Sequence, residues 1–203
     1  MDLERAESGI DEAARAAVTL AVAEIDPSDQ VEQEHRAAVL DWIASGAQLY
    51  RTVAPDVPPM HLVSYFVPFD ARRDELMLTA HRKSGLMLPP GGHCEQGETP
   101  WLTTERECVE ELGIPAVPVA PLGRRPLFVT VTQTRATAAV RRHTDVSLWF
   151  VLDVATGDPR LRPDPREFAS IQWLTLEHTL AEPIAGLDPH MHRFTRKLQA
   201  ALA

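Results

Sequence analysis

The sequence contains little cysteine: Cys94 and Cys108 are the only two in 203 residues, and they lack CxxC spacing. A chain of this length can bury a sizeable core without disulfides. Two cysteines with no evident role as a pair fit a reducing compartment. We therefore expect a globular protein that depends on no disulfide.

Long apolar runs are also missing. No stretch of about 18 apolar residues occurs, so no membrane span is predicted. The beginning, MDLERAESGIDE, lacks the basic-then-apolar order of a secretory signal, which favours a cytoplasmic location. With 44% hydrophobic and 24% charged residues, the composition indicates neither disorder nor a fibrous class.

Positive charge is scarce relative to negative charge. The sequence has 20 Lys and Arg against 29 Asp and Glu, a formal net charge of -9. Affinity for long nucleic acids comes from clustered Lys and Arg, so no such partner is expected. A small anionic ligand stays possible, because a bound divalent cation can create a local positive site.

Two amphipathic helices are predicted between about residues 9 and 46. The segment Asp26-Pro27-Ser28-Asp29 separates them, Asp29 with Glu32 is a candidate capping pair, and Gly46 is a candidate stop. We interpret residues 1–50 as a helical extension that serves core packing or a homodimer contact.

The main domain is predicted to span residues 51–203, with strands alternating with helices in an α/β layered arrangement. The patterns predict a hairpin over 61–67 and 75–80, and strands over 126–132, 145–154 and 170–174. The strand over 145–154 is apolar on both alternation sets, which indicates cover on both faces. Asp188-Pro189 predicts the start of a last helix, with Asp188 as N-cap.

Glycine and proline concentrate in residues 88–98, which predicts a loop whose backbone can approach a ligand closely. A helix from Pro100 to Leu112 should follow, because Thr99 is a good N-cap, proline suits the first helical position, and Gly113 is a good stop.

Three glutamates of this helix, Glu107, Glu110 and Glu111, fall within an arc of roughly 100°. They could be a solvated face, but their mutual repulsion and the preceding glycine loop favour a hard divalent cation, Mg²⁺ or Mn²⁺. Arg106 is expected to brace the loop against the helix. The apolar residues of the other arcs should pack on the sheet: Trp101, Leu102, Cys108, Val109 and Leu112.

The residues from Gly92 to Ile114 resemble the Nudix box, GX5EX7REUXEEXGU. The invariant positions are occupied by Gly92, Glu98, Arg106, Glu107, Glu110, Glu111 and Gly113. By composition such a match should arise on the order of once per million chains. One departure exists, since Cys108 stands where a larger aliphatic residue is usual.

The resemblance implies a Nudix-like α/β/α sandwich with a mixed sheet. It implies metal ligation by Glu107, Glu110, Glu111 and the Gly91 carbonyl, with Gly92, Glu98 and Gly113 as structural residues of the box. In relatives a loop acid often adds a metal-binding or base carboxylate, a place that Glu167 could occupy here. Alternatively, Glu167 is an exposed loop acid with no role in the site.

Four residues outside the glutamate set are candidates for substrate contact. Arg82, Lys83 and Arg142 could meet phosphates, although surface solvation is the commoner fate of such side chains. His93 follows the glycine pair and could line the site or make a structural hydrogen bond.

The function implied by the resemblance is Mg²⁺-dependent hydrolysis of a diphosphate linkage in a small nucleotide, such as a (deoxy)nucleoside triphosphate or a nucleotide sugar. The catalytic set would be Arg106 with the three glutamates. The alternative from another class is a non-catalytic Nudix-like domain that senses a nucleotide. The intact glutamates count against the sensor.

Overall fold

The computed structural model describes residues 2–54, 57–134 and 141–203, and side chains from residue 11 onward. The helices are α1 (Asp2–Ala23), α2 (Gln30–Ala44), α3 (Pro100–Leu112), α4 (Leu176–Ala181), the short 3-10 helix η1 (Ile184–Gly186) and α5 (Met191–Leu202). The strands are β1 (Met60–Asp70), β2 (Glu75–His81), β3 (Met87–Leu88), β4 (Gly91–His93), β5 (Phe128–Gln133), β6 (Thr144–Asp153) and β7 (Phe168–Thr175). Within these ranges no helix is long and apolar enough to cross a membrane.

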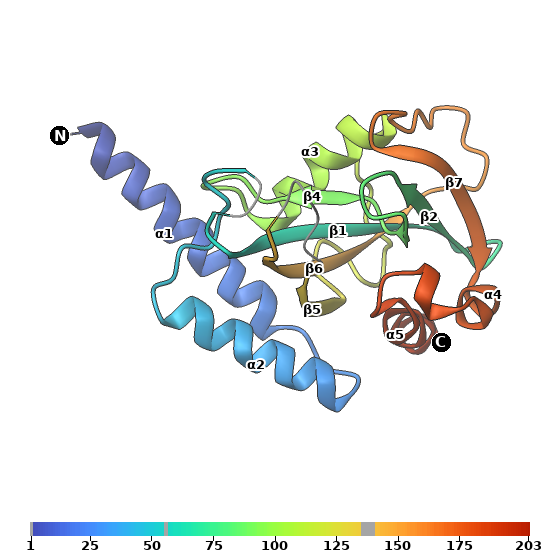
Figure 1. Cartoon of the computed structure of the whole chain (residues 1–203), viewed down its shortest axis with the longest axis horizontal. Helices are drawn as coiled ribbons and strands as arrows, with labels where there is room; N and C mark the ends of the chain where they lie inside the picture. Colours follow the sequence, from blue (N-terminus) through green and yellow to red (C-terminus); the bar gives the residue numbers. More distant parts are fainter. Residues whose placement is uncertain (1, 55–56, 135–140) are drawn as a thin grey trace.

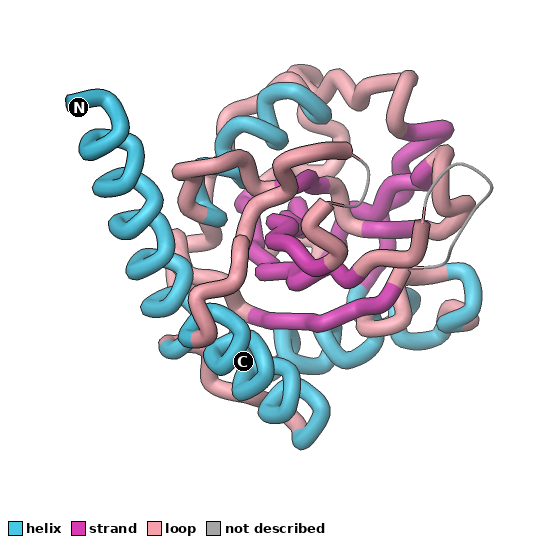
Figure 2. Tube along the Cα trace, turned by 60° about the vertical axis from the view of Figure 1, so that its left-hand side comes forward, coloured by secondary structure: helices cyan, strands magenta, loops and turns pink. Residues whose placement is uncertain are grey.

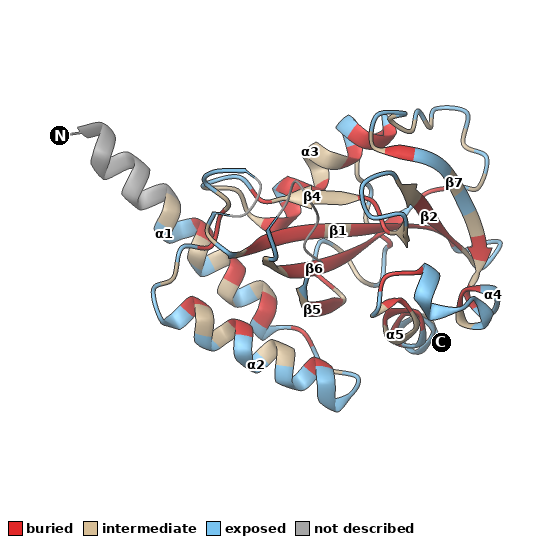
Figure 3. Cartoon of the chain, in the orientation of Figure 1, coloured by how far each residue is buried: buried red, intermediate tan, exposed pale blue. Residues whose placement is uncertain are grey.

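The strands form one mixed sheet in the order β3-β2-β1-β6-β5, with β4 also paired to β1 and β7 to β2. The predicted hairpin is confirmed, because β1 and β2 pair antiparallel. β1 and β6 run parallel along their whole length, with His61 beside Asp145 and Phe69 beside Asp153. Both strands are buried almost throughout (Figure 3).

Helices cover both faces of the sheet, as Figure 1 shows for α3 and α5. Leu148 and Phe150 of β6 belong to a buried cluster shared with α1, α2 and α3. Trp149 and Val151 point to the other face, in a cluster shared with α5. The strands lie between these layers (Figure 2), so the predicted α/β/α arrangement and the cover on both faces of this strand are confirmed.

The N-terminal helices pack on the sheet domain. Val18 and Ile43 are buried in the same cluster as Leu62. Arg15 of α1 donates to the carbonyl oxygens of Ile43 and Ala47, which ties α1 to the end of α2. The predicted helices are therefore present, while the division at residue 50 stays a prediction.

The N-cap at Asp29 is confirmed, since its carboxylate accepts from the Glu32 backbone N–H. The Glu32 carboxylate does not return a hydrogen bond to Asp29: it accepts from the Ser28 backbone N–H and pairs with Lys197 of α5. The buried Lys197 ammonium attracts this carboxylate away from the usual capping geometry.

Three further expectations are corrected. α5 begins at Met191, not at Asp188, because the Asp188 carboxylate accepts from the His190 N–H and closes a turn before the helix. Residues 91–93 form β4 rather than a loop. Leu102 and Val109 of α3 are exposed, whereas Trp101, Cys108 and Leu112 are buried as predicted. The apolar face that the helix presents to the sheet is therefore narrower than the sequence periodicity predicted.

Candidate metal and diphosphate site

Helix α3 has the predicted bounds and is held in a fixed register on the sheet. Thr99 caps its start by accepting from the Leu102 N–H, and Gly113 ends it in the left-handed conformation with φ 71°. The buried Ser64 hydroxyl of β1 contacts the Pro100 carbonyl and the Thr104 hydroxyl, each at 2.8 Å. These contacts fix which face of α3 meets β1 and β4.

Arg106 links the residues of the box that precede α3 to the glutamates on α3. Its guanidinium donates to Glu98 from Nε at 2.9 Å and from Nη2 at 3.1 Å, a bidentate pair. It also donates to the His93 carbonyl, to Glu107 at 2.7 Å and to Glu110 at 3.3 Å. These are the contacts that the predicted bracing role requires.

Two glycines let the carboxylates of α3 approach β4. Glu111 Oε2 accepts from the Gly91 backbone N–H at 2.8 Å. Gly91 has φ 145°, a conformation that favours glycine, and a Cβ there would overlap the Ser64 carbonyl. A Cβ at Gly92 would overlap the Glu107 carboxylate. The glycine pair therefore provides the space in which two acids lie against a strand.

Arg106 forms an ion pair with Glu107, whereas within the described residues no ion pair joins Glu111 to a cationic side chain. Burial, together with the nearby Glu107, raises the pKa of Glu111 to about 8, and the hydrogen bond from the Gly91 N–H acts in the opposite direction. Burial also raises the pKa of Glu107, against the opposing influence of Arg106. Two buried carboxylates that repel each other are an all-oxygen donor set for a hard divalent cation, so these residues fit Mg²⁺ or Mn²⁺.

Other predicted residues lie around this pair. Glu110 is exposed, with 58% of its side chain accessible. Glu167 precedes β7, and its charge contributes to the raised pKa of Glu111. It also forms an ion pair with Lys83 at 2.9 Å, which brings a predicted phosphate contact beside a predicted metal ligand.

The remaining candidates are placed differently. Arg82 donates to the Pro165 carbonyl, next to the Glu167 loop. Arg142 contacts Gln133 at the end of β5, and in the described part of the chain no hydrogen bond joins it to the box. Their predicted roles in substrate binding stay predictions.

The ring of His93 lies in a cluster that sequence reasoning missed. It approaches His61, with ring centroids 4.9 Å apart, and its Nε2 lies 3.2 Å from Arg51 Nη1. Burial, with help from Arg51, lowers the pKa of His93 to about 3. His143 and Asp145 complete the cluster. No local pattern signals it, because its members come from separate strands.

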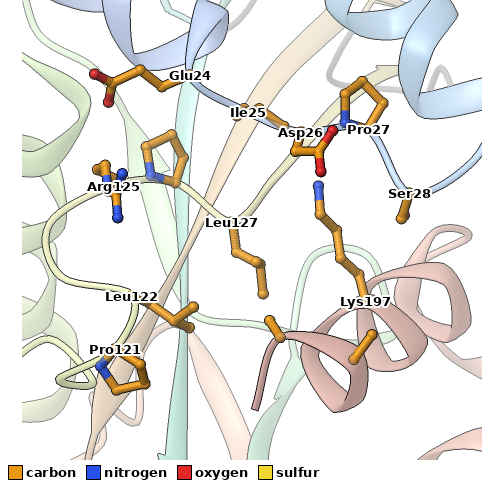
Figure 4. A pocket seen from close by; sticks show the side chains of 13 residues that line it. Glu24, Ile25, Asp26, Pro27, Ser28, Pro121, Leu122, Arg125, Leu127 and Lys197 are labelled. Carbon is orange, nitrogen blue, oxygen red and sulfur yellow. The ribbon is translucent and has the colours of Figure 1, made fainter. Parts of the chain in front are cut away.

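A cavity of about 380 Å³ lies elsewhere, between the connection from α1 to α2, residues 121–127 and α5. Figure 4 shows Asp26 and Lys197 pointing toward one another at its wall. Its lining includes no residue of the box. The candidate site therefore rests on its donor atoms rather than on this cavity.

The sequence matches the model of the NUDIX domain over residues 60–198. The chain belongs to the NUDIX domain family. The match covers β1 to α5 and includes the whole box, and it leaves α1 and α2 outside. The resemblance stated from residues 92–114 is thereby confirmed.

One solved structure supports the same fold. A MutT protein from Methanosarcina mazei Go1 is similar at 17% identity, with a TM-score of 0.51, over 73% of this chain and 97% of that chain. A NUDIX-family hydrolase from Clostridium perfringens is 19% identical, with a TM-score of 0.49, over 69% of this chain and 97% of that one. No curated protein matches the chain.

Proposed function

We propose that this chain hydrolyses a diphosphate linkage in a small nucleotide, with Mg²⁺ or Mn²⁺ held by Glu107, Glu110, Glu111 and the Gly91 carbonyl. Family membership supports hydrolysis of a pyrophosphate linkage in general terms. The observation that carries the proposal is a pair of acids, the largely buried Glu107 and the buried Glu111, set against a glycine strand. In the described part of the chain Arg106 pairs with Glu107, and no ion pair neutralises Glu111.

The chemistry divides between the ion and the chain. A bound divalent cation neutralises diphosphate oxygens and polarises phosphorus. Arg106 holds Glu98 and Glu107 in place and fixes the His93 carbonyl, which ties the start of the box to the helix. Glu110 is the exposed acid of the set and can accept a proton from water at the open side of the site.

Glu167 is proposed as a further acid of this site, and Lys83 and Arg82 as phosphate contacts. Support comes from position: Lys83 and Glu167 form an ion pair, and the charge of Glu167 acts on Glu111. A substrate phosphate could replace the carboxylate as the partner of Lys83. The substrate class, a (deoxy)nucleoside triphosphate or nucleotide sugar, and the cytoplasmic location are part of the proposal.

The test is a screen for phosphate or pyrophosphate release across nucleotide classes, with Mg²⁺, with Mn²⁺ and with a chelator. Turnover should require the metal. Glu110→Gln and Glu111→Gln should each lower kcat by at least about 10²-fold, the scale of a lost catalytic base or metal ligand.

Glu105→Gln is the matched control, because Glu105 lies on the same helix and pairs only weakly with Arg124, at 3.8 Å. Its turnover should stay within about twofold of the parent. Tight binding of a nucleotide without turnover in any metal would contradict the proposed enzymatic activity and favour a non-catalytic domain that senses a nucleotide.

A further inference from the structure

We propose that His61, His93, His143 and Asp145 form a second metal site, for a zinc-like cation, separate from the glutamates of α3. The four side chains offer one donor atom each, and these atoms lie within 4.8 Å of one another. Imidazole nitrogen is a preferred ligand of zinc and similar transition metals, whereas Mg²⁺ prefers an all-oxygen set. The two sites therefore differ in the metal they select.

The sheet register gathers these residues on one face. His61 of β1 lies directly beside Asp145 of the parallel β6. His93 of β4 lies opposite Val63, two residues along β1 from His61, so its ring points to the same side. Ser64, on the other side of β1, contacts α3. The cluster thus lies on the face opposite the helix that carries the glutamates.

Hydrogen bonds orient the imidazoles for ligation. His61 Nδ1 lies 2.8 Å from the Pro58 carbonyl, and His143 Nδ1 lies 3.1 Å from the Arg141 carbonyl. A carbonyl only accepts, so His61 Nδ1 carries the proton, and its Nε2 is then free to bind a metal when the ring is neutral. His143 Nδ1 also lies 3.1 Å from the Thr134 hydroxyl, so two polar groups orient this ring. A histidine ligand held in this way by a backbone carbonyl is the usual arrangement around metals.

Two buried atoms of the cluster have no partner. Within the described residues, His61 Nε2 and Asp145 Oδ1 are buried and make no hydrogen bond. His61 is completely buried, and an unsatisfied buried polar group costs about 1–3 kcal/mol. The two atoms lie 3.4 Å from each other, so one shared cation would satisfy both.

The distances match a tetrahedral ion. Asp145 Oδ1 lies 3.4 Å from His61 Nε2 and 3.4 Å from His143 Nε2. Zinc bonds of about 2.0–2.1 Å in a tetrahedron separate neighbouring ligand atoms by about 3.3–3.4 Å. The two distances from Asp145 Oδ1 therefore already have the spacing that zinc requires.

Arg51 is a residue that opposes metal binding at this cluster. Its guanidinium, which only donates, lies 3.2 Å from His93 Nε2. Ligation through either nitrogen of His93 conflicts with this contact, because the lone pair of Nε2 is occupied or Nε2 must carry a proton. Metal binding therefore has to displace Arg51.

The experiment titrates the metal-free full chain with Zn²⁺ by calorimetry, and with Co²⁺ by visible absorption, in millimolar excess of Mg²⁺. We expect one equivalent of Zn²⁺ and a four-coordinate Co²⁺ spectrum. Asp145→Asn and His143→Gln should abolish both, while Glu110→Gln/Glu111→Gln should retain both. Arg51→Gln should bind Zn²⁺ roughly tenfold more tightly, the effect of removing a unit charge beside a dication.

No Zn²⁺ binding to the parent chain, or binding lost with the glutamates and kept in Asp145→Asn, would overturn the proposal. Unaltered or weaker Zn²⁺ binding by Arg51→Gln would also contradict the proposed site. This measurement tests the proposal even if the Asp145→Asn variant does not fold. Nucleotide hydrolysis is not measured, so the outcome is independent of the proposed function.

Discussion

At the scale of single residues, Gly92 is required for space rather than for backbone conformation. Its φ is not positive, but a Cβ would overlap the Glu107 carboxylate. Gly92→Ala should push Glu107 away from β4 and weaken Mg²⁺ or Mn²⁺ binding by roughly 10- to 100-fold, as when a group that positions a ligand is lost. Mn²⁺ affinity measured by electron paramagnetic resonance checks this.

Gly186→Ala is the matched control, since its Cβ would meet nothing within 4 Å and its φ is not positive. It should leave Mn²⁺ affinity unchanged. Equal Mn²⁺ affinity of Gly92→Ala and the parent chain would contradict the role assigned to the Glu107 carboxylate.

The residues of the box could be predicted because their spacing lies within one loop and one helix. Periodicity alone places Glu107 and Glu111 on one side of α3. The pairing of His61 with Asp145 depends on the register of two strands 84 positions apart in sequence, and no local rule specifies that register. For this reason the histidine cluster could not be predicted, although the position of each histidine in the sequence was known.

At the scale of elements, Asp29 has two roles at the start of α2. It caps the helix, and it pairs with Arg193 of α5 at 2.6 Å. The Arg193 hydrogen bond lowers the pKa of Asp29 to about 2. Asp29→Asn keeps a capping oxygen but loses the charge, so it should lower the free energy of unfolding at neutral pH.

The pH dependence of this effect has a defined sign. The pKa of Asp29 is lower in the folded chain than its ordinary value of 3.8, so its ionised form stabilises the fold above that pH and the contribution falls as the pH drops toward about 2. Urea unfolding of the parent and Asp29→Asn should therefore converge as the pH falls below about 4. A difference that grows on acidification would rule out the Arg193 pairing as its cause.

Element boundaries could be predicted where local chemistry decides them. Thr99, Pro100 and Gly113 set both ends of α3, and these ends are as expected. Asp188-Pro189 has the same local signature, yet α5 begins later, because the Asp188 side chain is engaged in a turn with His190. A cap and a turn use the same residue types, so sequence alone does not separate them.

At the scale of the whole molecule, the N-terminal helices share their buried cluster with the sheet. Deleting residues 1–46 would remove Val18 and Ile43 from contact with Leu62 and would break the Glu32–Lys197 ion pair, whose partners are both buried. The deletion would leave Lys197 without its partner and would expose to water the apolar surface that these helices cover. The truncated chain should therefore melt at a lower temperature than the parent and self-associate through the exposed apolar surface.

The site should survive in whatever fraction of the truncated chain stays folded. The groups that position the glutamates, Ser64, Gly91 and Arg106, lie outside the deleted segment, and so does Tyr50, whose hydroxyl donates to the Glu98 carbonyl. Light scattering of the parent tests the predicted homodimer. A folded truncation that binds no Mn²⁺, or one as stable as the parent, would contradict this division of roles.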